Sequence, residues 1–440
     1  MSPPIELNKR SLPNSAWSAS SRQSPEIRPL AGEVRAGVAV VGAGFTGLST
    51  AIHVHEKGGD AVVLDAGEPG WGASGRNGGQ VIPGLKQDPT SLKATFGETR
   101  GEHLVRWAGG SADKVFDLIR RYGIECDARQ QGWIQPAHAP AALETVRQRV
   151  EAWRQRGVEA RELTSAETTQ LVGCAEGIFH GGWLDPRGGA VHPLDYARGL
   201  ARAARDLGAR VFSHTRARAL RRGAAGEWII ETESGTVRAE RVVLATNGYT
   251  DELRPDLRRS LIPVYSFQIA TRPLSENVRR TIFPQEHVAS DTRRLLRYFR
   301  LDRDGRLLMG GRGPFSDSPT FADGAGHRAE IEKLFPQVGE PDLDYVWSGR
   351  VAITRDHLPH LHEVEPGVFA GVGFNGRGVA MGTLMGECLA DLALGARSAD
   401  MPLPVTPVRG VPFHALMRPA VSAMVAYYRH LDRREARTAS

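Results

Sequence analysis

The sequence predicts an α/β protein whose parallel sheet is assembled from parts of the chain that lie far apart. Residues 38–67 read as strand, glycine-rich turn, helix and second strand, which is a βαβ unit of ordinary size. The segment VVLA at 242–245 reads as a buried strand, and residues 368–394 repeat the pattern of strand, glycine-rich turn and helix. Further strands are expected within 262–315. The fold is therefore α/β, or α+β overall, with a discontinuous nucleotide-binding part.

The remaining elements follow from helix start and stop signals. Residues 1 to about 34 read as an extended arm, and its one large apolar residue, Trp17, is expected to dock on the body. Helices are expected at 100–122 and at 141–156, the second ending before Gly157. Residues 193–212 read as a helix that begins at a proline and is followed by a strand.

Composition and charge exclude several classes of protein. The chain has 440 residues, of which 41% are hydrophobic and 24% charged, as in a soluble globular protein larger than one ordinary domain. The net charge of +6 comes from arginines spread along the chain, without a basic block or a nucleic-acid-binding motif, so we expect no nucleic-acid partner. No apolar run approaches the ~20 residues that span a membrane, and no signal peptide is recognisable. We expect a cytoplasmic protein.

The cysteines argue against a disulfide framework and a structural zinc site. Cys126, Cys174 and Cys388 lie far apart and form no CxxC pair. We therefore expect no metal, and a reducing compartment.

A dinucleotide fingerprint follows the first strand. Gly42, Gly44 and Gly47 form G-x-G-x-x-G directly after VAVV, and a helical segment follows. The first glycine permits a tight turn, the second lets the backbone approach a pyrophosphate, and the third lets helix and strand pack closely. Asp65 ends the second strand, 23 residues after Gly42, where a carboxylate accepts hydrogen bonds from an adenosine ribose. The spacing predicts a cofactor that contains ADP.

Two more glycine-rich segments favour a flavin over a nicotinamide. WGASGRNGGQ at 71–80 follows the second strand at once, and GVGFNGRGVAMG at 371–382 opens a late helix. Reduced flavin carries negative charge on its pyrimidine side, and the N-terminus of a helix directed there would stabilise that charge. A nicotinamide dehydrogenase has no comparable need for the second turn.

Six motifs carry a resemblance to a known family. They are VVGAGFTGLSTA, GASGRNGGQ, VVLATNGYT, GRLLMGGRG, VWSGRVAITRDHLPHL and GVGFNGRGVAMGTLMGECLAD, in this order. With them the chain resembles the FAD-dependent amine and amino-acid oxidases, a superfamily that includes D-amino acid oxidase, glycine oxidase and sarcosine oxidase. Its closest likeness is to the gamma-glutamylputrescine oxidoreductase branch. The resemblance covers nearly the whole chain and is specific for the family, but only weakly so for the substrate.

The resemblance implies a Rossmann-like FAD-binding domain and a second domain whose mixed β-sheet covers the flavin. It also implies the chemistry: hydride transfer from a C–H bond beside an amine nitrogen to flavin N5, giving an imine that hydrolyses. The electron acceptor is oxygen or another compound. The boundaries we expect are 1–34 for the arm, 35–120, 180–260 and 345–400 for the FAD domain, 121–179 and 261–344 for the substrate or cap domain, and 401–440 for a helical tail.

The residues expected at the FAD follow from the fingerprint and the resemblance. Those at the pyrophosphate and adenosine are Gly42, Gly44, Phe45, Thr46, Gly47, Asp65 and Ala66, with the backbone of Val211 at the adenine. Those along the rest of the cofactor are Ser74, Arg76, Asn77, Gly78, Gly79, Ala245, Thr246, Gly376, Arg377, Gly378 and Val379. The family's sarcosine oxidases tether flavin through a cysteine, which WSGRVAITRD lacks, so non-covalent FAD is expected.

Catalytic and substrate residues are less marked, because hydride transfer from an amine needs positioning more than an acid–base pair. The candidates near the reacting atoms are Tyr298, Arg312 and Arg350, and those in the substrate pocket are Tyr265 and Phe267. Sarcosine oxidases carry a lysine near flavin N5 that promotes reaction with oxygen. The matching strand here places Leu308 at that position, which puts oxygen as the acceptor in doubt.

Three alternatives remain open from the sequence. The protein could be an FAD-dependent amine dehydrogenase that uses an acceptor other than oxygen. A flavin monooxygenase also begins with G-x-G-x-x-G, but it would need an NADPH-binding motif, and none is recognisable. A non-catalytic flavin-binding protein built on the same fold is the third. The substrate is a small amine or amino acid in the leading interpretation, and the oligomeric state stays open.

Overall fold

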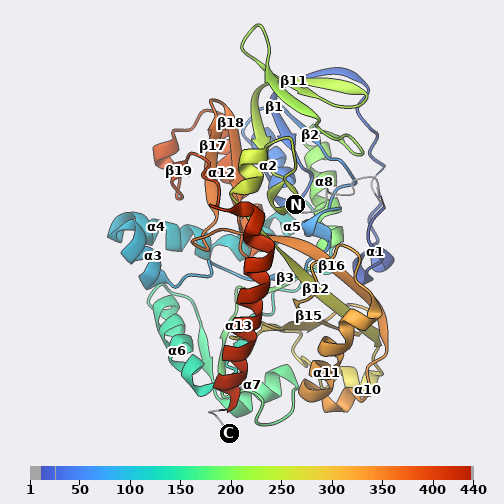
Figure 1. Cartoon of the computed structure of the whole chain (residues 1–440), viewed down its shortest axis with the longest axis vertical. Helices are drawn as coiled ribbons and strands as arrows, with labels where there is room; N and C mark the ends of the chain where they lie inside the picture. The colour runs from blue at the N-terminus through green and yellow to red at the C-terminus, as the bar shows by residue number, and fades with distance from the viewer. Residues whose placement is uncertain (1–10, 25, 438–440) are drawn as a thin grey trace.

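Two sheets, each with its own layer of helices, form the molecule (Figure 1). The computed structural model describes residues 11–24 and 26–437. The first ten residues of the predicted arm and its residue 25 lie outside the described part. Among the described residues, no helix is both long and apolar enough to cross a membrane.

The nine-stranded sheet is mainly parallel at its centre. β1 pairs in parallel with β2 and with β11, and β11 pairs in parallel with β18. The strand order along its main path is β19 (Val405–Thr406), β17 (His360–Glu365), β18 (Val368–Val372), β11 (Gly235–Leu244), β1 (Gly32–Val41), β2 (Ala61–Leu64) and β8 (Arg210–Phe212). Off this path, β10 (Trp228–Glu231) pairs with β11 and with β9 (Ala219–Arg222). Segments from the start, the middle and the end of the chain therefore share one sheet, as predicted.

The helices that follow β1 and β18 begin at the same edge of this sheet. They are α2 (Phe45–Glu56) and α12 (Gly378–Ala393). Because both strands run in the same direction, both helix N-termini lie at the carboxyl ends of the strands. The two helices pack closely, since a Cβ on Gly386 would lie 2.5 Å from the Cβ of Ser49. α8 (Pro193–Asp206) also packs on α2, where the Tyr196 and Phe45 rings are 5.1 Å apart.

The eight-stranded sheet lies at the other end of the molecule (Figure 1). Its order is β16 (Leu343–Ile353), β12 (Ile262–Pro273), β15 (Arg306–Arg312), β14 (Tyr298–Leu301), β13 (Val288–Ser290), β4 (Trp133–Pro136), β6 (Gly182–Asp185), β5 (Arg161–Leu163). It is mixed, because β13 pairs in parallel with β4 and its other pairs are antiparallel. A short third sheet joins β3 (Gln80–Val81) and β7 (Gly189–Ala190).

Alternation along the strands gives the eight-stranded sheet two different faces. One face buries Phe267, Met309 and Phe299 in an apolar core under α11 (Ala325–Leu334). The other face carries the neighbouring side chains, among them Tyr298 and Gln268, and meets the glycine-rich loop 71–80. This second face is the one that positions the site.

The boundaries between the two sheets differ from those expected. β6 and most of β16 fall within the predicted FAD-domain segments 180–260 and 345–400, yet both strands pair in the eight-stranded sheet. β19 lies in the segment expected to be a helical tail but joins the nine-stranded sheet. β6 and β19 are too short to show a periodicity that would reveal which sheet they join, and β16 shows no regular alternation of buried and exposed residues.

The predicted helices formed, one of them with a break, and the structure contains several more that had not been predicted. The helix expected at 100–122 is two helices, α4 (Glu98–Gly109) and α5 (Ser111–Arg121), and the helix at 141–156 is α6 (Pro140–Arg154). The arm is not wholly extended, because it contains α1 (Ala16–Ser20). The other α-helices are α3 (Pro89–Phe96), α7 (Ser165–Val172), α9 (Pro255–Arg259), α10 (Glu276–Arg279) and α13 (Met417–Arg437), and the 3-10 helices are η1 (Ala73–Gly75), η2 (Asn247–Tyr249), η3 (Phe321–Gly324), η4 (Pro336–Val338), η5 (Ser398–Asp400) and η6 (His414–Leu416).

Candidate functional site

The turn after β1 can be built only from glycine. Gly42 has φ +113°, and a Cβ there would lie 2.9 Å from the Ala245 carbonyl oxygen. A Cβ on Gly47 would lie 1.9 Å from the Gly42 carbonyl oxygen, so α2 could not pack against the turn. The same contact places Ala245, at the end of β11, beside the fingerprint, and the Ala245 N–H donates to the Val41 carbonyl at 2.9 Å. The first and third glycines of the motif thus have the roles expected of them.

Free backbone donors remain at the start of α2. The N–H groups of Gly44, Thr46 and Gly47 have no hydrogen-bond partner in the described part of the chain. The Phe45 N–H differs, because it donates to the Ser74 Oγ at 3.0 Å. Unpaired N–H groups at a helix N-terminus form a site for an anion such as a pyrophosphate. Ser74 therefore closes one side of this site and binds the turn itself.

Asp65 links the end of β2 to the fingerprint turn. Its carboxylate accepts hydrogen bonds from the Ala43 N–H at 2.6 Å and the Gly67 N–H at 2.8 Å. Burial raises the pKa of Asp65, and the two backbone donors oppose that shift. Each oxygen keeps a further lone pair for a ribose hydroxyl. Ala66, the next residue, is half-buried. Val211 lies on the edge strand β8 and pairs with Val63 on β2.

The glycine-rich loop lies between the two sheets. The Arg76 carbonyl accepts hydrogen bonds from the Trp347 Nε1–H at 2.9 Å and from the Gln268 side-chain amide, both on the eight-stranded sheet. The Arg76 guanidinium is turned back onto Trp71, 4.7 Å from the ring centre. The Asn77 side chain accepts the Gly79 N–H at 2.8 Å and so shapes the loop. The side chains of Arg76 and Asn77 thus bond other parts of the protein, and their contacts with FAD stay a prediction.

The second glycine-rich turn begins α12. Gly376 has φ +92°, and the N–H groups of Gly378 and Val379 have no partner among the described residues. The Arg377 guanidinium donates to the Pro83 carbonyl at 2.6 Å and lies 5.1 Å from the Trp133 ring centre. Thr246, after β11, bonds Thr250 and closes the adjoining turn. A second helix N-terminus with free donors thus shares the sheet edge with the first.

Tyr298 lies where the loop meets the eight-stranded sheet. Its hydroxyl bonds the Ser266 hydroxyl at 2.7 Å. A Cβ on Gly310 would lie 2.0 Å from its ring, and one on Gly78 would lie 2.7 Å from it. Burial raises the pKa of Tyr298 far above its ordinary value, so the phenol stays protonated. Glycines on both sides therefore hold this ring against the loop.

Among the described residues, Lys86, Arg312 and Arg377 form a group of cations without carboxylate partners, and one of them, Arg312, lies near Tyr298. Burial lowers the pKa of Lys86, and the charges of Arg377 and Arg312 lower it further. Burial also lowers the pKa of Arg312, which the nearby Tyr298 partly offsets. In the described part of the chain, Lys86, Arg312 and Arg377 form no ion pair with a carboxylate. The charges of Asp88 and Asp185 act on Arg377, so the positive charge that is left to attract an anion is chiefly that of Lys86 and Arg312.

Lys86 and Gln268 were not predicted from the sequence. Lys86 stands alone in a loop, without a motif, and its neighbours Arg312 and Arg377 are far away in sequence. Nothing in the sequence shows that β15 and the start of α12 lie near this loop, so Lys86 could not be recognised from the sequence.

Arg350 and Tyr265 form a separate group at the end of β12 and β16. The two residues are opposite each other in register, and the Arg350 guanidinium lies 5.7 Å from the Tyr265 ring centre. Arg350 pairs with Asp317 and lies 5.5 Å from the Tyr249 ring centre. Its charge is therefore already matched within the protein. Tyr265 and Arg312 both border a hollow of ≈130 Å³ that α13 partly covers.

Phe267 does not belong to the substrate pocket, contrary to the prediction. It is fully buried on the opposite face of the sheet, where its ring meets His327 edge-on at 5.0 Å. Ser266 and Gln268, its neighbours in sequence, are the residues that face the loop. Phe267 turns away from the loop because a strand changes face with every residue, and Tyr265 stays a prediction. Leu308, expected near the flavin, packs into an apolar cluster with Trp17 and Trp347.

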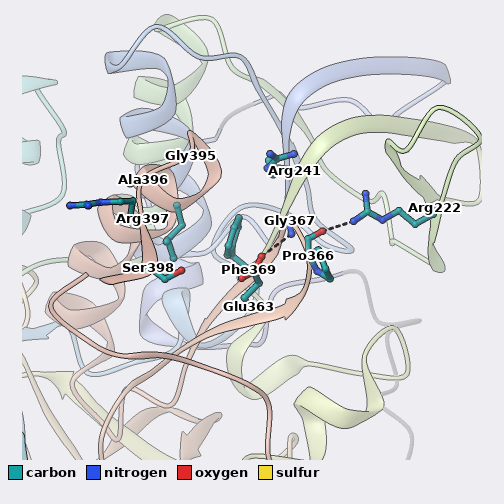
Figure 2. A pocket seen from close by; sticks show the side chains of 11 residues that line it. Arg222, Arg241, Glu363, Pro366, Gly367, Phe369, Gly395, Ala396, Arg397 and Ser398 are labelled. Carbon is teal, nitrogen blue, oxygen red and sulfur yellow. Dashed lines mark hydrogen bonds between the residues drawn. The ribbon is translucent and has the colours of Figure 1, made fainter. Parts of the chain in front are cut away.

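A cavity of ≈450 Å³ lies elsewhere, at the C-terminal end of α12 (Figure 2). Its lining includes Arg222, Arg241 and Arg397. Arg222 donates to the Pro366 carbonyl, Arg241 donates to the Glu240 carbonyl at 3.1 Å and Arg397 pairs with Asp400, so all three arginines are engaged. None of the predicted site residues borders this cavity, and we assign it no role in the chemistry.

The described residues contain one group of side chains with the spacing of metal ligands. Single ligand atoms of His138, Asp432 and Glu435 lie within 4.8 Å of one another. The Arg294 guanidinium bonds both carboxylates, at 3.1 Å and 2.7 Å. A cation is thus already present, and the group serves to fasten α13 to the body of the protein.

Comparison with known proteins agrees with this geometry. Residues 37–392 match the model of the DAO family, described as FAD dependent oxidoreductase. The chain is 31% identical to the gamma-glutamylputrescine oxidoreductase of Escherichia coli (strain K12) over 437 residues, or 96% of this chain and 98% of that one. It is 32% identical to a probable oxidoreductase, OrdL, of Haemophilus influenzae over 86% of this chain and 87% of that one.

The fold is shared with solved structures. The glycine oxidase of Geobacillus kaustophilus superposes with a TM-score of 0.72 at 23% identity, covering 84% of this chain and 98% of that one. The FAD cofactor of the family fits the two helix N-termini with unpaired N–H groups and the turn that only glycine can form. The family model covers most of the chain, so this protein belongs to the DAO family of FAD-dependent oxidoreductases.

Proposed function

We propose that this oxidoreductase oxidises the carbon–nitrogen bond of an amine or amino acid that carries a carboxylate group. The observation that supports the substrate class is the gathering of Lys86, Arg312 and Arg377 without a carboxylate partner in the described part of the chain. An anion held there would match charges that burial leaves poorly solvated. The names of two relatives, gamma-glutamylputrescine oxidoreductase and glycine oxidase, support the proposal that a carbon–nitrogen bond is oxidised.

The residues that would hold FAD follow from the free backbone donors. Gly44, Thr46 and Gly47 at the start of α2 would bind its pyrophosphate, and Gly378 and Val379 at the start of α12 would face its pyrimidine side. When bound, FAD accepts the two electrons and the hydrogen removed from the carbon beside the amine nitrogen. The positive end of α12 would favour the negative charge that results.

The side chains near Tyr298 would bind and orient the amine. The Tyr298 phenol stays protonated because burial raises its pKa, so it would donate or accept a hydrogen bond and would not act as a base. Lys86 and Arg312 would fix the carboxylate at the other end of the substrate. Two fixed ends would hold the reacting C–H bond in one orientation, which is the main need of a hydride transfer.

We propose, further, that FAD is bound without a covalent link and that the enzyme works in the cytoplasm. Cys126, Cys174 and Cys388 are all buried and form no disulfide. Burial raises the pKa of the Cys174 thiol to about 11, so it stays a thiol at neutral pH. We expect acid precipitation to release all of the flavin, and yellow colour in the pellet would contradict this.

The experiment that tests the function is anaerobic reduction of the purified holoenzyme. Loss of the flavin absorption near 450 nm, a wavelength typical of any bound oxidised flavin, would be followed on adding paired compounds, each an amino acid and its amide. We expect the carboxylates to reduce the flavin at least about tenfold faster than the amides, since a charged hydrogen bond contributes ~1.5–3 kcal/mol. Equal rates within every pair would contradict the carboxylate site. Readmitting air would then show whether oxygen or another compound is the acceptor.

A further inference from the structure

Buried donors hold three carbonyl groups of the loop 76–79 from the side of the eight-stranded sheet and the N-terminal arm. Trp347 and Gln268 donate to the Arg76 carbonyl, and the Trp17 Nε1–H donates to the Asn77 carbonyl at 2.8 Å. The Arg300 guanidinium donates to the Gly79 carbonyl at 3.0 Å. The donor residues are all buried, so water does not compete for these bonds.

The orientation of each carbonyl fixes that of the next N–H group. The described chain contains no cis peptide bond, and in a trans peptide the C=O and N–H bonds point in opposite directions. The Asn77 carbonyl points to Trp17, so the Gly78 N–H points away from Trp17. That N–H has no partner among the described residues, whereas the Asn77 N–H is already bonded to the Ala73 carbonyl at 3.2 Å. Gly78 is also the residue that borders Tyr298.

Trp17 belongs to the arm and not to either sheet. Its side chain is 1% exposed and lies edge-on to His192 at 5.0 Å and to Trp347 at 6.1 Å. The arm behind it is fastened at Asp195, which is fully buried and accepts the Ser21 hydroxyl at 2.6 Å and the Arg22 N–H at 3.1 Å. A segment remote in sequence from the loop is thus anchored so that one indole donor meets one carbonyl.

We propose that the N-terminal arm is part of the cofactor site, with Trp17 as a positioning residue. Trp17 holds the Asn77–Gly78 peptide in the orientation that directs the Gly78 N–H to the FAD. The glycine-rich loop has few side chains of its own with which to fix its peptides, and the arm supplies the missing constraint. This inference concerns the cofactor and does not depend on which amine is oxidised.

Three single substitutions of the full chain separate positioning from packing. Trp17→Phe removes the donor and keeps an aromatic ring. Trp183→Phe is the matched control, because Trp183 is also buried and its Nε1–H donates to the Gln135 side chain at 3.0 Å, within the eight-stranded sheet. Trp347→Phe removes a donor from the same apolar cluster, but Gln268 still holds the Arg76 carbonyl and the Asn77 N–H has its own partner.

The measurements are made on apoprotein, before any turnover. The melting temperature reports the loss of packing, and titration with FAD, followed by quenching of flavin fluorescence, gives the dissociation constant. We expect similar losses of melting temperature for Trp17→Phe and Trp183→Phe. We expect the FAD dissociation constant to rise about tenfold in Trp17→Phe alone, the effect of one misdirected hydrogen bond, and to stay within about twofold in the other two.

Either of two results would overturn the proposal. One is an unchanged FAD affinity in Trp17→Phe. The other is an equal loss in Trp347→Phe, which would show that the loop responds to any loosening of the cluster. If Trp17→Phe yields no folded apoprotein, Ser21→Ala loosens the same arm at Asp195. A rise of about threefold in the dissociation constant would then support the proposal, and an unchanged value would contradict it.

Discussion

The two sheets contribute different kinds of chemical group to the candidate site. The carboxyl edge of the nine-stranded sheet offers backbone N–H groups, at Thr46 and Gly47 in α2 and at Gly378 in α12. The eight-stranded sheet offers side chains, above all Tyr298 and Arg312. Backbone groups are the same in every residue, so the first region depends on where glycine allows the chain to turn. The second depends on which residue faces the loop.

This difference decides how each region tolerates change. In the nine-stranded sheet a single added methyl group meets backbone atoms, which cannot move without displacing a helix or a strand. In the eight-stranded sheet a substitution removes one contact and leaves the framework in place. We therefore expect the largest effects at the glycine turns, and smaller effects on the facing sheet.

Gly47→Ala should have the largest effect of all. Its Cβ would lie 1.9 Å from the Gly42 carbonyl oxygen, so α2 must shift away from the turn. We expect a loss of about 3 kcal/mol in the free energy of unfolding, and no measurable FAD binding in protein that still folds. Denaturant unfolding of the apoprotein and an FAD titration measure the two effects. Gly326→Ala, on α11, is the control, because a Cβ there meets nothing within 4 Å.

Gly78→Val tests the place where the two regions meet. A Cβ there would lie 2.7 Å from the Tyr298 ring, and the branched side chain would press the loop and the ring apart. We expect FAD affinity to fall about 100-fold, while the apoprotein unfolds within about 1 kcal/mol of the parent, because the loop lies between the sheets and not in a core. Full flavin occupancy in this variant would contradict the assignment of the loop to the cofactor.

The cofactor region could be predicted from the sequence because its signals are local. The fingerprint at 42–47 and the turn at 376–379 are short runs of glycine between a strand and a helix, and each can be recognised without knowing the rest of the fold. The docking of Trp17 was also predicted, since a lone tryptophan in a polar arm must cover its ring. What it contacts could not be predicted, because Asn77 is 60 residues away.

The facing sheet could be predicted only to the level of its strands. Phe267 and Gln268 are adjacent, yet one lies in a closed core and the other holds the loop. Both faces of this strand are largely buried, so its residues show no alternation that would reveal which face meets the cofactor. Lys86 gave no signal, because its significance comes from Arg312 and Arg377, which only the folded chain brings near it.

Lys86→Met tests the charge that this region offers. We expect the Michaelis constant of a carboxylate substrate to rise about tenfold at any pH at which Lys86 is charged in the parent. Burial and the neighbouring arginines lower the pKa of Lys86, so the parent should lose this cation at a lower pH than an ordinary lysine. Its Michaelis constant should therefore rise as pH is raised through that pKa, and the rise should be absent in Lys86→Met. A parallel rise in both enzymes would assign the titration to another group.

Phe267→Leu should have the smallest effect on function. Phe267 is fully buried against His327 on the face that turns away from the loop. The substitution leaves a modest cavity, so we expect a loss of about 1 to 2 kcal/mol in the free energy of unfolding. The Michaelis constant and FAD affinity should stay within about twofold of the parent. Gln268→Leu, one residue along the same strand, should do the reverse. Trp347 still holds the Arg76 carbonyl, but the Gln268 side chain also lies against Gly78, and a branched Leu side chain there should weaken FAD binding about fivefold. An equal loss of FAD affinity in both variants would contradict the assignment of one face of β12 to the core and of the other face to the cofactor site.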